Sequence, residues 1–225
     1  MARARTRPLS RKRVLRAAIT RADKGGIDSL SMRKLADGLG VKAMSLYKHV
    51  ANKDDLLDGM LDAVFAEFDL PGPGTEWKTG VRGIAISAHE TLVRHAWAAG
   101  LWSSQKPGAA RLRYGNALLG CFRDAGFSKE VTYHAYHIIE SYILGYTFQV
   151  LGFGQVDPEQ LAGVATAFLT GDFAAEYPNF YEHVLQHLQP DSQLEEESGY
   201  EIGLDLILAG LEPLRGKSGQ ISPSR

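Results

Sequence analysis

The 225-residue sequence contains one cysteine, no long hydrophobic run and almost no net charge. A single thiol, Cys121, excludes an intramolecular disulfide and any metal site built from several cysteines. Its apolar neighbours favour a small buried hydrophobe over a reactive thiol. No apolar run reaches the roughly 18 residues that a membrane span requires, and no apolar core of a signal peptide follows the arginine-rich N-terminus. We therefore expect a cytoplasmic protein that does not associate with membranes.

The formal net charge of −1 conceals an uneven distribution of charge along the chain. Residues 1–53 contain 14 Lys and Arg but only 3 Asp and Glu, whereas residues 54–225 contain 11 and 23. A basic first part on an acidic remainder indicates a polyanionic partner for the first part alone. Hydrophobic residues make up 44% of the chain, which is enough to bury a core and excludes wholesale disorder.

Apolar residues recur at helical spacing in every long segment, and no segment shows a convincing strand pattern, so the predicted fold class is all-α. Ser10 and Ser31 are expected caps of the first two helices, which glycines at 25–26 and 40 end. The other predicted helices are Ala43–Val50, the segment from Lys53 to Phe68, Trp77–Ala99, Ala109–Ala125, Lys129–Leu151, Pro158–Tyr177, Glu182–Leu188 and Gly199–Leu214, with a loop at Asp191–Ser198.

The two short helices on either side of Gly40 form a helix-turn-helix pattern. A helix that enters a DNA major groove needs an apolar inner face and a small or polar outer face. Leu46 and Val50, four residues apart, supply the inner face. The first helix begins with Ser31, Arg33 and Lys34, where backbone N–H groups and cations can hold phosphate. Because this pattern lies in the basic segment, DNA binding is favoured over a merely solvated helix face.

The strongest helix breaker is Leu70-Pro-Gly-Pro-Gly74, which is the expected domain boundary. The prediction is an N-terminal three-helix helix-turn-helix head plus a C-terminal helical bundle. Its parts are a flexible basic arm at 1–9, the DNA-binding domain at 10–53, a connecting helix at 54–70, a ligand-binding and dimerisation domain at 75–215 and a tail at 216–225.

Residues 30–57, LSMRKLADGLGVKAMSLYKHVANKDDLL, resemble the DNA-binding domain of TetR-family transcriptional regulators, and in detail the tetracycline-repressor branch. The L-A-x-x-L-G-V turn, L-Y-x-H-V and N-K-x-x-L-L carry the resemblance, which extends from about Ser10 to Phe68. Residues 200–214, YEIGLDLILAGLEPL, also resemble the last helix of that branch. The resemblance implies a homodimer with two small heads on larger helical bodies. It also implies that a small molecule bound in the body weakens binding to the operator.

The resemblance implies DNA contacts at ten positions. Ser31 and Lys53 match positions that hold phosphates, and Arg33 matches one that can read a guanine edge bidentately. Lys42 and Ala43 match positions that set sequence preference, and Lys48 matches one that varies but faces the groove. Ser45, Tyr47 and His49 match positions that contact the DNA backbone. The tenth, Met44, replaces the small residue or proline often found there.

Two of these positions, and the basic arm, leave alternatives open. Met44 either touches a thymine methyl group or packs against its own chain. Tyr47 either contacts the backbone or is half-buried with only its hydroxyl at a phosphate. The arm residues Arg3, Arg5 and Arg7 either enter an adjacent minor groove or contribute only non-specific attraction.

The last predicted helix is apolar all round, so it must be buried on more than one face. Packing within the chain would cover one face. A reader of a palindromic operator also needs two heads one DNA turn apart, which favours a homodimer over intrachain packing alone. The expected interface residues are Ile202, Leu206, Ala209 and Leu211, with residues 157–175 as a second candidate region.

Aromatic and polar side chains are mixed over Tyr133–Val150 and its neighbours, which is typical of a cavity with a few orienting groups. Aromatic residues at helical spacing are equally typical of a plain core. The candidate effector-binding residues are Trp97, Trp102, Tyr114, Phe122, His134, His137, Tyr142 and Tyr146. His134, His137 and Glu140 have a spacing that a metal tolerates, but no fourth ligand is evident, so we expect no metal and no cofactor.

Three functions therefore compete. The first is a ligand-responsive regulator, most simply a repressor that a small molecule releases from double-stranded DNA; activation stays open. The second is a DNA-binding regulator without small-molecule control. The third is an enzyme, such as a hydrolase using Ser141, His137 and Glu140. The third is disfavoured because three near neighbours on one helix do not readily form a triad, and no strained turn or oxyanion hole is indicated.

Overall fold

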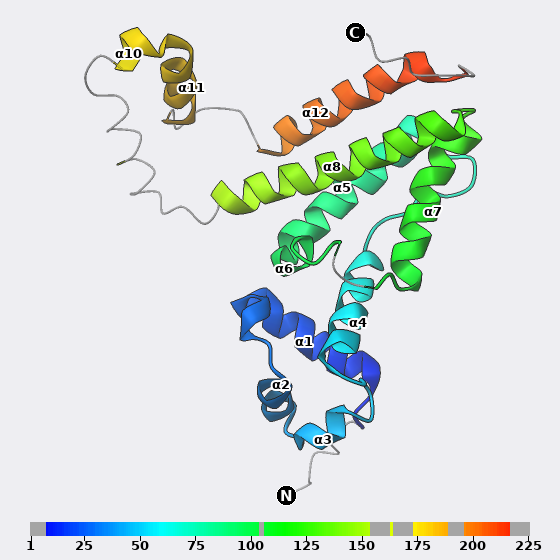
Figure 1. Cartoon of the computed structure of the whole chain (residues 1–225), viewed down its shortest axis with the longest axis vertical. Helices are drawn as coiled ribbons and strands as arrows, with labels where there is room; N and C mark the ends of the chain where they lie inside the picture. Colours follow the sequence, from blue (N-terminus) through cyan, green and yellow to red (C-terminus); the bar gives the residue numbers. More distant parts are fainter. Residues whose placement is uncertain (1–7, 104–105, 154–162, 164–172, 189–195, 217–225) are drawn as a thin grey trace, which may run out of the picture.

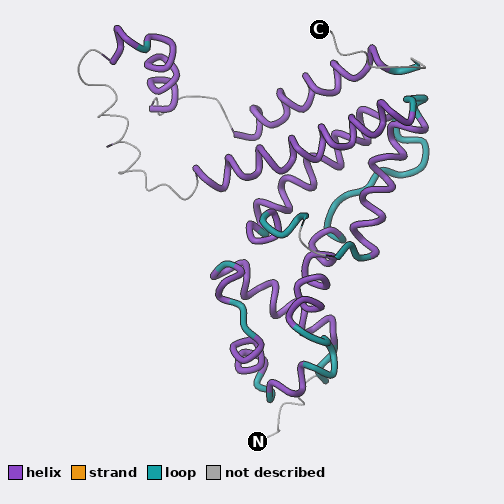
Figure 2. The backbone as a smooth tube through the Cα atoms, in the orientation of Figure 1, coloured by secondary structure: helices purple, strands orange, loops and turns teal. Residues whose placement is uncertain are grey.

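The computed structural model describes residues 8–103, 106–153, 163, 173–188 and 196–216. These residues form helices and turns and include no strand, so the predicted all-α class is confirmed (Figure 2). A small head of three helices lies at one end, a larger helical body lies at the other, and helix α4 runs from one into the other (Figure 1). None of the helices described is long and apolar enough to cross a bilayer.

The head contains α1 (Arg11–Gly25), a short 3-10 turn (Ile27–Ser29), α2 (Met32–Leu39) and α3 (Ala43–Leu46). Ser10 and Ser31 cap the helices as predicted, and each hydroxyl accepts a hydrogen bond from the backbone N–H three residues on. Gly40 takes the left-handed conformation, with φ of 67°, which lets the chain turn between α2 and α3. Val14, Ala18, Leu35, Leu46 and Val50 are among the buried residues that hold the three helices together.

Helix α4 (Lys53–Phe65) begins at an Asn52 cap and joins the two parts of the molecule. It packs against α1 in the head and against α5 and α7 in the body. In the body, α5 (Trp77–Arg94) packs against α7 (Ala109–Asp124) and α8 (Lys129–Phe153), and α12 (Glu196–Leu211) lies across α5 and α8. A 3-10 turn (Glu212–Leu214) follows α12.

Several helix ends differ from the sequence prediction. Helix α3 is four residues long because tight turns at Tyr47–His49 replace its expected last turn. The expected helix Trp77–Ala99 is broken at His95, whose φ and ψ are −117° and 57°, and continues as α6 (Ala96–Ala99). Apolar spacing continues through this break, so periodicity alone did not locate it.

The C-terminal half shows further differences. Helix α12 begins at Glu196, so the loop predicted at Asp191–Ser198 is wrong for its last three residues, and residues 191–195 lie outside those described. The helix predicted over Pro158–Tyr177 lies largely outside them too, and its end contains α10 (Phe173–Glu176). The helix predicted at Glu182 starts earlier, as α11 (Pro178–Leu188), with proline at its first position. Helices α10 and α11 lie to one side of the body in Figure 1.

Candidate DNA-binding head and effector site

The outer face of the head is built by α3 and the start of α2. Leu46 and Val50 are buried as predicted, which turns the opposite side of α3 outward. Met44 is 73% exposed, so packing against its own chain, one of its two expected roles, is wrong. Tyr47 is 44% exposed and therefore has more than its hydroxyl available. Lys42 and Lys48 are exposed as well, while Ala43, Ser45 and His49 are partly exposed.

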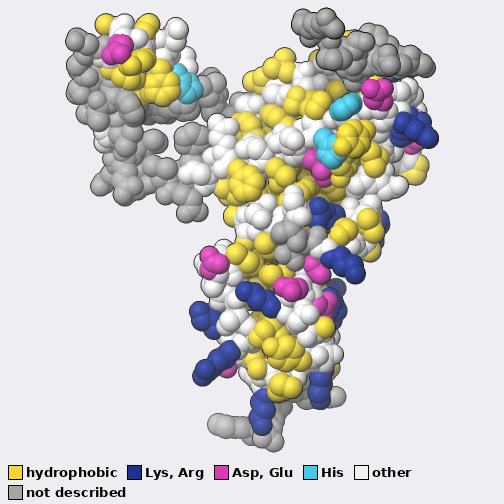
Figure 3. Space-filling view, in the orientation of Figure 1, with side chains coloured by type: hydrophobic (Ala, Val, Ile, Leu, Met, Phe, Trp, Pro, Cys, Tyr) yellow, Lys and Arg dark blue, Asp and Glu magenta, His cyan; other side chains and the backbone are white. Residues whose placement is uncertain are grey.

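Cations border this surface. Arg33 and Lys34 are exposed in the first turn of α2, and Lys53 is exposed at the first position of α4. Figure 3 shows Lys and Arg side chains over the lower end of the molecule, which is the head. The first turns of α2 and α4 also direct unpaired backbone N–H groups outward, and such groups attract anions.

An ion pair that the sequence did not reveal fixes the head internally. The Arg11 guanidinium in α1 donates to the Asp55 carboxylate at 2.7 Å and to the carbonyl oxygen of His49 at 2.9 Å. Asp55 also accepts a hydrogen bond from the Ala51 N–H at 2.7 Å. The hydrogen bonds from Arg11 and then Ala51 lower the pKa of Asp55 to about 2. The end of the α3 region, α1 and α4 are therefore held in one arrangement.

Helix α4 also holds the N-terminus of α7. The N-cap of α7 is Gly108, which has no side chain, and Asp62 of α4 takes over the capping role. Its Oδ1 accepts hydrogen bonds from the N–H groups of Ala110, at 2.8 Å, and Arg111, at 3.1 Å. A methyl group at position 108 would collide with the Asp62 carboxylate, so the close approach requires glycine.

Two of the candidate effector residues, Trp102 and Tyr114, meet at the body end of α4. Both are buried, and their rings contact Phe65, with centroids 4.6 and 5.4 Å away, and Phe68. The Tyr114 hydroxyl is buried and has no hydrogen-bond partner among the described residues. A buried hydroxyl without a partner is costly, which marks this position as unusual for a plain core.

A partly buried carboxylate lies beside this aromatic cluster. Glu140 of α8 accepts a hydrogen bond from the Tyr136 hydroxyl at 2.8 Å. Burial raises the pKa of Glu140 above its ordinary value, in spite of this hydrogen bond. Burial and the negative charge of Glu140 likewise raise the pKa of Tyr114. We call Phe65, Phe68, Trp102, Tyr114 and Glu140 the α4-end cluster.

Two further candidates, Tyr142 and Tyr146, belong to a second group around Tyr200 of α12. The ring of Tyr200 stacks on His89 at 4.2 Å and on Tyr142 at 5.1 Å, and the edge of Tyr146 approaches it at 5.1 Å. The Tyr142 hydroxyl donates to the carbonyl oxygen of Tyr200. Burial lowers the pKa of His89, whose Nδ1 lies 2.8 Å from the Thr147 hydroxyl.

The other four candidates do not join either group. Phe122 is fully buried between Trp77 and Phe127, because it faces the core side of α7. The indole N–H of Trp97 donates to the head, at Asp23 of α1. His134 and His137 are exposed on the outer face of α8. Within the residues that the structure describes, no three His, Cys, Asp or Glu side chains are grouped as a metal would require.

Two faces of α12 have different surroundings. Ile202 and Leu206 are 59% and 69% exposed, and Ala209 is exposed beside them. Leu211, expected at the dimer interface, is instead buried in its own chain, because it lies on the same side of the helix as Leu204 and Leu208. Of the second candidate region, 157–175, only Gly163 and residues 173–175 are described.

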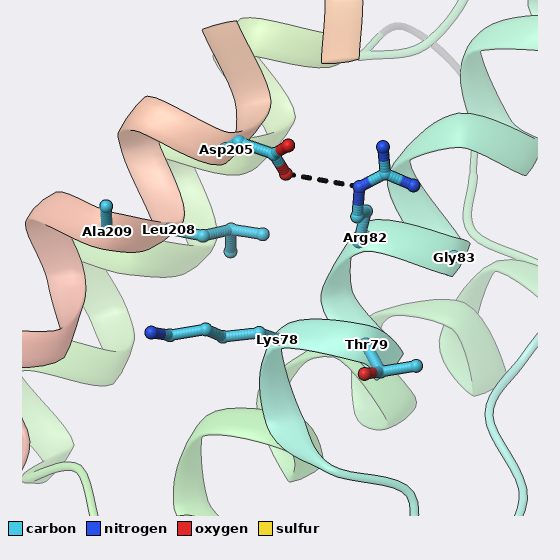
Figure 4. A pocket seen from close by; sticks show the side chains of 7 residues that line it. All are labelled: Lys78, Thr79, Arg82, Gly83, Asp205, Leu208 and Ala209. Atoms are coloured by element: carbon cyan, nitrogen blue, oxygen red, sulfur yellow. Dashed lines mark hydrogen bonds and ion pairs between the residues drawn. The ribbon is translucent and has the colours of Figure 1, made fainter. Parts of the chain in front are cut away.

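A groove of about 580 Å³ separates α5 from α12 (Figure 4). Lys78 and Arg82 extend from α5 along it, and both are paired with carboxylates of the C-terminal segment. Arg82 contacts Glu201 at 2.6 Å and Asp205 at 3.1 Å, and Lys78 contacts Glu212 at 2.9 Å. These ion pairs tie α12 to α5.

A cationic helix-turn-helix head that shares one helix with a larger helical body defines a DNA-binding regulator. The family model described as bacterial regulatory proteins, tetR family, matches residues 14–60. The model described as tetracyclin repressor-like, C-terminal domain, matches residues 70–215. The chain belongs to the TetR family, whose members are transcriptional regulators and not enzymes.

Named relatives agree with this assignment. An HTH-type transcriptional regulator of Saccharopolyspora erythraea is 37% identical, over 63% of this chain and 61% of that protein. The class A tetracycline repressor of Escherichia coli is 33% identical over 59% of this chain, and 62% of its own length is matched. The class C tetracycline repressor of the same species is 28% identical over 92% of both chains. The chain thus spans less than two thirds of the first two relatives.

Solved structures share the fold along nearly the whole chain. Apo ActR of Streptomyces coelicolor is 27% identical, with a TM-score of 0.71, and the match covers 94% of this chain and 100% of that one. ActR in complex with actinorhodin superposes with a TM-score of 0.77 over the same shares, at 24% identity.

Proposed function

We propose that this protein is a ligand-responsive repressor that binds a palindromic operator as a homodimer in the cytoplasm and leaves it when a small molecule enters the body. The observation that carries the proposal is the exposed, cation-bordered face of α3 on a head that α4 joins directly to the body. The names of its relatives support the repressor role, since two are tetracycline repressors.

In this proposal α3 lies in the major groove, and the first turns of α2 and α4 hold phosphates on either side. Arg33 reads a guanine edge, and the exposed side chain of Met44 contacts a thymine methyl group. Ser31 and Lys53 hold phosphates. The remaining contacts, to the groove or the backbone, are made by Lys42, Ala43, Ser45, Tyr47, Lys48 and His49.

The proposed dimer forms through the outer faces of α8 and α12. Ile202, Leu206 and Ala209 of α12 are exposed, and α8 presents Ile138 and Phe148 to solvent. Exposed large apolar side chains along two adjacent helices mark a protein–protein interface, and a self-complementary face gives two-fold symmetry. That symmetry would place two heads on the two halves of a palindrome.

The proposed effector region is the α4-end cluster. An aromatic ligand with a hydrogen-bonding group would contact the rings of Trp102 and Tyr114 and satisfy the partnerless Tyr114 hydroxyl. It would also displace Phe65, the last residue of the helix that joins head and body, or Phe68, which follows that helix three residues on. A small molecule is bound by at least one other protein of this fold, since ActR is solved in complex with actinorhodin.

The experiment that tests the proposal is selection of bound duplexes from random DNA by the purified protein. Enrichment of an inverted repeat is the expected result, and a sample that enriches no motif at low salt would contradict DNA recognition. The recovered duplex is then titrated with protein in the presence of aromatic compounds that raise the melting temperature. Loss of DNA affinity supports effector control, whereas stabilisation without loss favours a regulator that no small molecule releases.

A further inference from the structure

Asp23, near the end of α1, reaches from the head to the body. One of its carboxylate oxygens, Oδ1, accepts a hydrogen bond from the indole N–H of Trp97 at 2.7 Å. The same oxygen lies 2.7 Å from Nδ1 of His95. Because an ionised carboxylate can only accept, Nδ1 carries the proton. Both body residues are buried, whereas the Asp23 side chain is 27% exposed, so the two hydrogen bonds are partly shielded from water and strengthened by charge.

The other side of the His95 ring faces the end of α4. Its Nε2 lies 3.4 Å from Oε2 of Glu67, which follows α4. Arg94 also approaches the Glu67 carboxylate at 3.4 Å. His95 therefore lies between two carboxylates, that of Asp23 in α1 and that of Glu67 just after the end of α4.

The break between α5 and α6 is what makes this arrangement possible. Its non-helical residue is His95 itself, and the chain direction changes there so that His95 and Trp97 both reach α1. Trp102, a few residues further on, belongs to the α4-end cluster. One short stretch of the body thus contacts both the head and the proposed effector region.

We propose that Asp23 is a positioning residue for operator binding. The hydrogen bonds of Asp23 with His95 and Trp97 fix the angle between head and body. They thereby fix the distance between the two recognition helices of a dimer. This inference rests on the proposed function, since it requires two heads on one duplex. Two half-sites lie about 34–36 Å apart, one DNA turn, so a head free to change its angle must be ordered again when the second half-site is bound.

The test compares Asp23→Ala and Asp23→Asn on two duplexes recovered by selection, one with both half-sites and one with a single half-site. The alanine variant lacks both hydrogen bonds and is expected to lose about tenfold in affinity for the duplex with both half-sites, which corresponds to about 1.4 kcal/mol. Its affinity for the single half-site should be unchanged, because no DNA contact is lost. Asp23→Asn keeps the oxygen that accepts both N–H groups and should restore most of the affinity.

A second readout uses duplexes in which the half-sites are moved one or two base pairs closer or further apart. The wild type should reject these, and the alanine variant should discriminate less between them, which a fold defect in the head would not produce. Trp97→Phe, which keeps a ring but removes the donor, should behave like Asp23→Ala and replaces it if that variant does not fold.

Arg33→Ala is the matched control, and it should lower the affinity for both duplexes. Equal losses on both duplexes for Asp23→Ala, or no loss on either, would overturn the proposal. A wild type that binds no duplex would instead remove the proposed function itself.

Discussion

Arg33 is the side chain that we propose reads a base edge. It is exposed in the first turn of α2. We expect Arg33→Ala to cost about 1–3 kcal/mol on the selected operator and to relax preference at one base pair. Competition binding against a series of single-base operator variants measures both effects.

Lys53→Ala provides the contrast for that measurement. As a phosphate contact it should weaken cognate and random DNA alike and reduce the salt dependence of binding by roughly one unit of slope. If Arg33→Ala showed the same uniform loss, Arg33 would be a phosphate contact as well and not a base reader.

Asp55 makes the stability of the head depend on pH in the acid range. Its pKa is about 2 in the folded chain against an ordinary value of 3.8, so ionised Asp55 favours the folded state. This stabilisation is complete above the unfolded-state pKa and is lost as the pH falls from about 4 to about 2. Because the ion pair is partly exposed, we expect Asp55→Asn to cost less than about 1 kcal/mol near neutral pH.

Urea unfolding of wild type and Asp55→Asn across that acid range is the measurement. The difference between the two proteins should shrink as the pH falls. A difference that stayed constant would assign the effect of Asp55 to packing and not to its charge.

Some of these side-chain roles follow from local sequence and others do not. The caps at Ser10 and Ser31, and the buried pair Leu46 and Val50, are predicted because their partners lie within four residues. Arg11 and Asp55 are 44 positions apart, and Asp23 and Trp97 are 74 apart. No spacing rule connects such pairs, and only the folded chain brings them together.

Helix α7 depends on a cap that another helix supplies. Since Asp62 of α4 accepts from two N–H groups at its start, we expect Asp62→Ala to lower the free energy of unfolding by about 0.5–2 kcal/mol. Chemical denaturation gives the loss, and hydrogen exchange should show faster exchange at Ala110 and Arg111. Asp37→Ala, at an exposed position of α2, is the control; an equal loss there would mean that the Asp62 cap contributes nothing specific.

Periodicity predicted which segments are helical better than where the helices end. It placed α7 and α8 to within two residues, because apolar residues recur at helical spacing along both segments. It missed the break at His95 because the interactions that favour it, with Asp23 and Glu67, come from distant segments. It also overextended α3, whose expected last turn is replaced where Arg11 binds the carbonyl of His49.

A charged residue on the outer face of α12 tests the oligomeric state of the protein. We expect Leu206→Arg to convert the proposed dimer to a monomer, because it places a cation in the proposed apolar interface. Sedimentation velocity reports the change, and affinity for the duplex with both half-sites should fall with it.

Leu112→Arg is the matched control, since Leu112 of α7 is 62% exposed and lies outside the proposed interface. It should leave the sedimentation coefficient unchanged. A Leu206→Arg protein that still sediments as a dimer would remove this face of α12 from the interface.

The distribution of charge along the sequence predicted a basic first part followed by an acidic remainder, and the family resemblance implied that these are a head and a body. Apolar spacing puts Ile202, Leu206 and Ala209 on one face of α12 and Leu204, Leu208 and Leu211 on another. Spacing does not say which face the chain itself buries, so Leu211 was expected at an interface although its own chain buries it. The sequence pattern placed eight residues in one effector region, whereas the fold divides them among two aromatic groups, the core, the head contact and the surface. Packing between helices decides these divisions, and no single helix pattern contains that information.

Gly108 fits so closely beneath Asp62 that any larger residue must force the carboxylate aside. Such a replacement would disturb the contact between α4 and the start of α7. If the proposed function holds, we expect a genetic screen for strains that no longer answer their signal to return position 108.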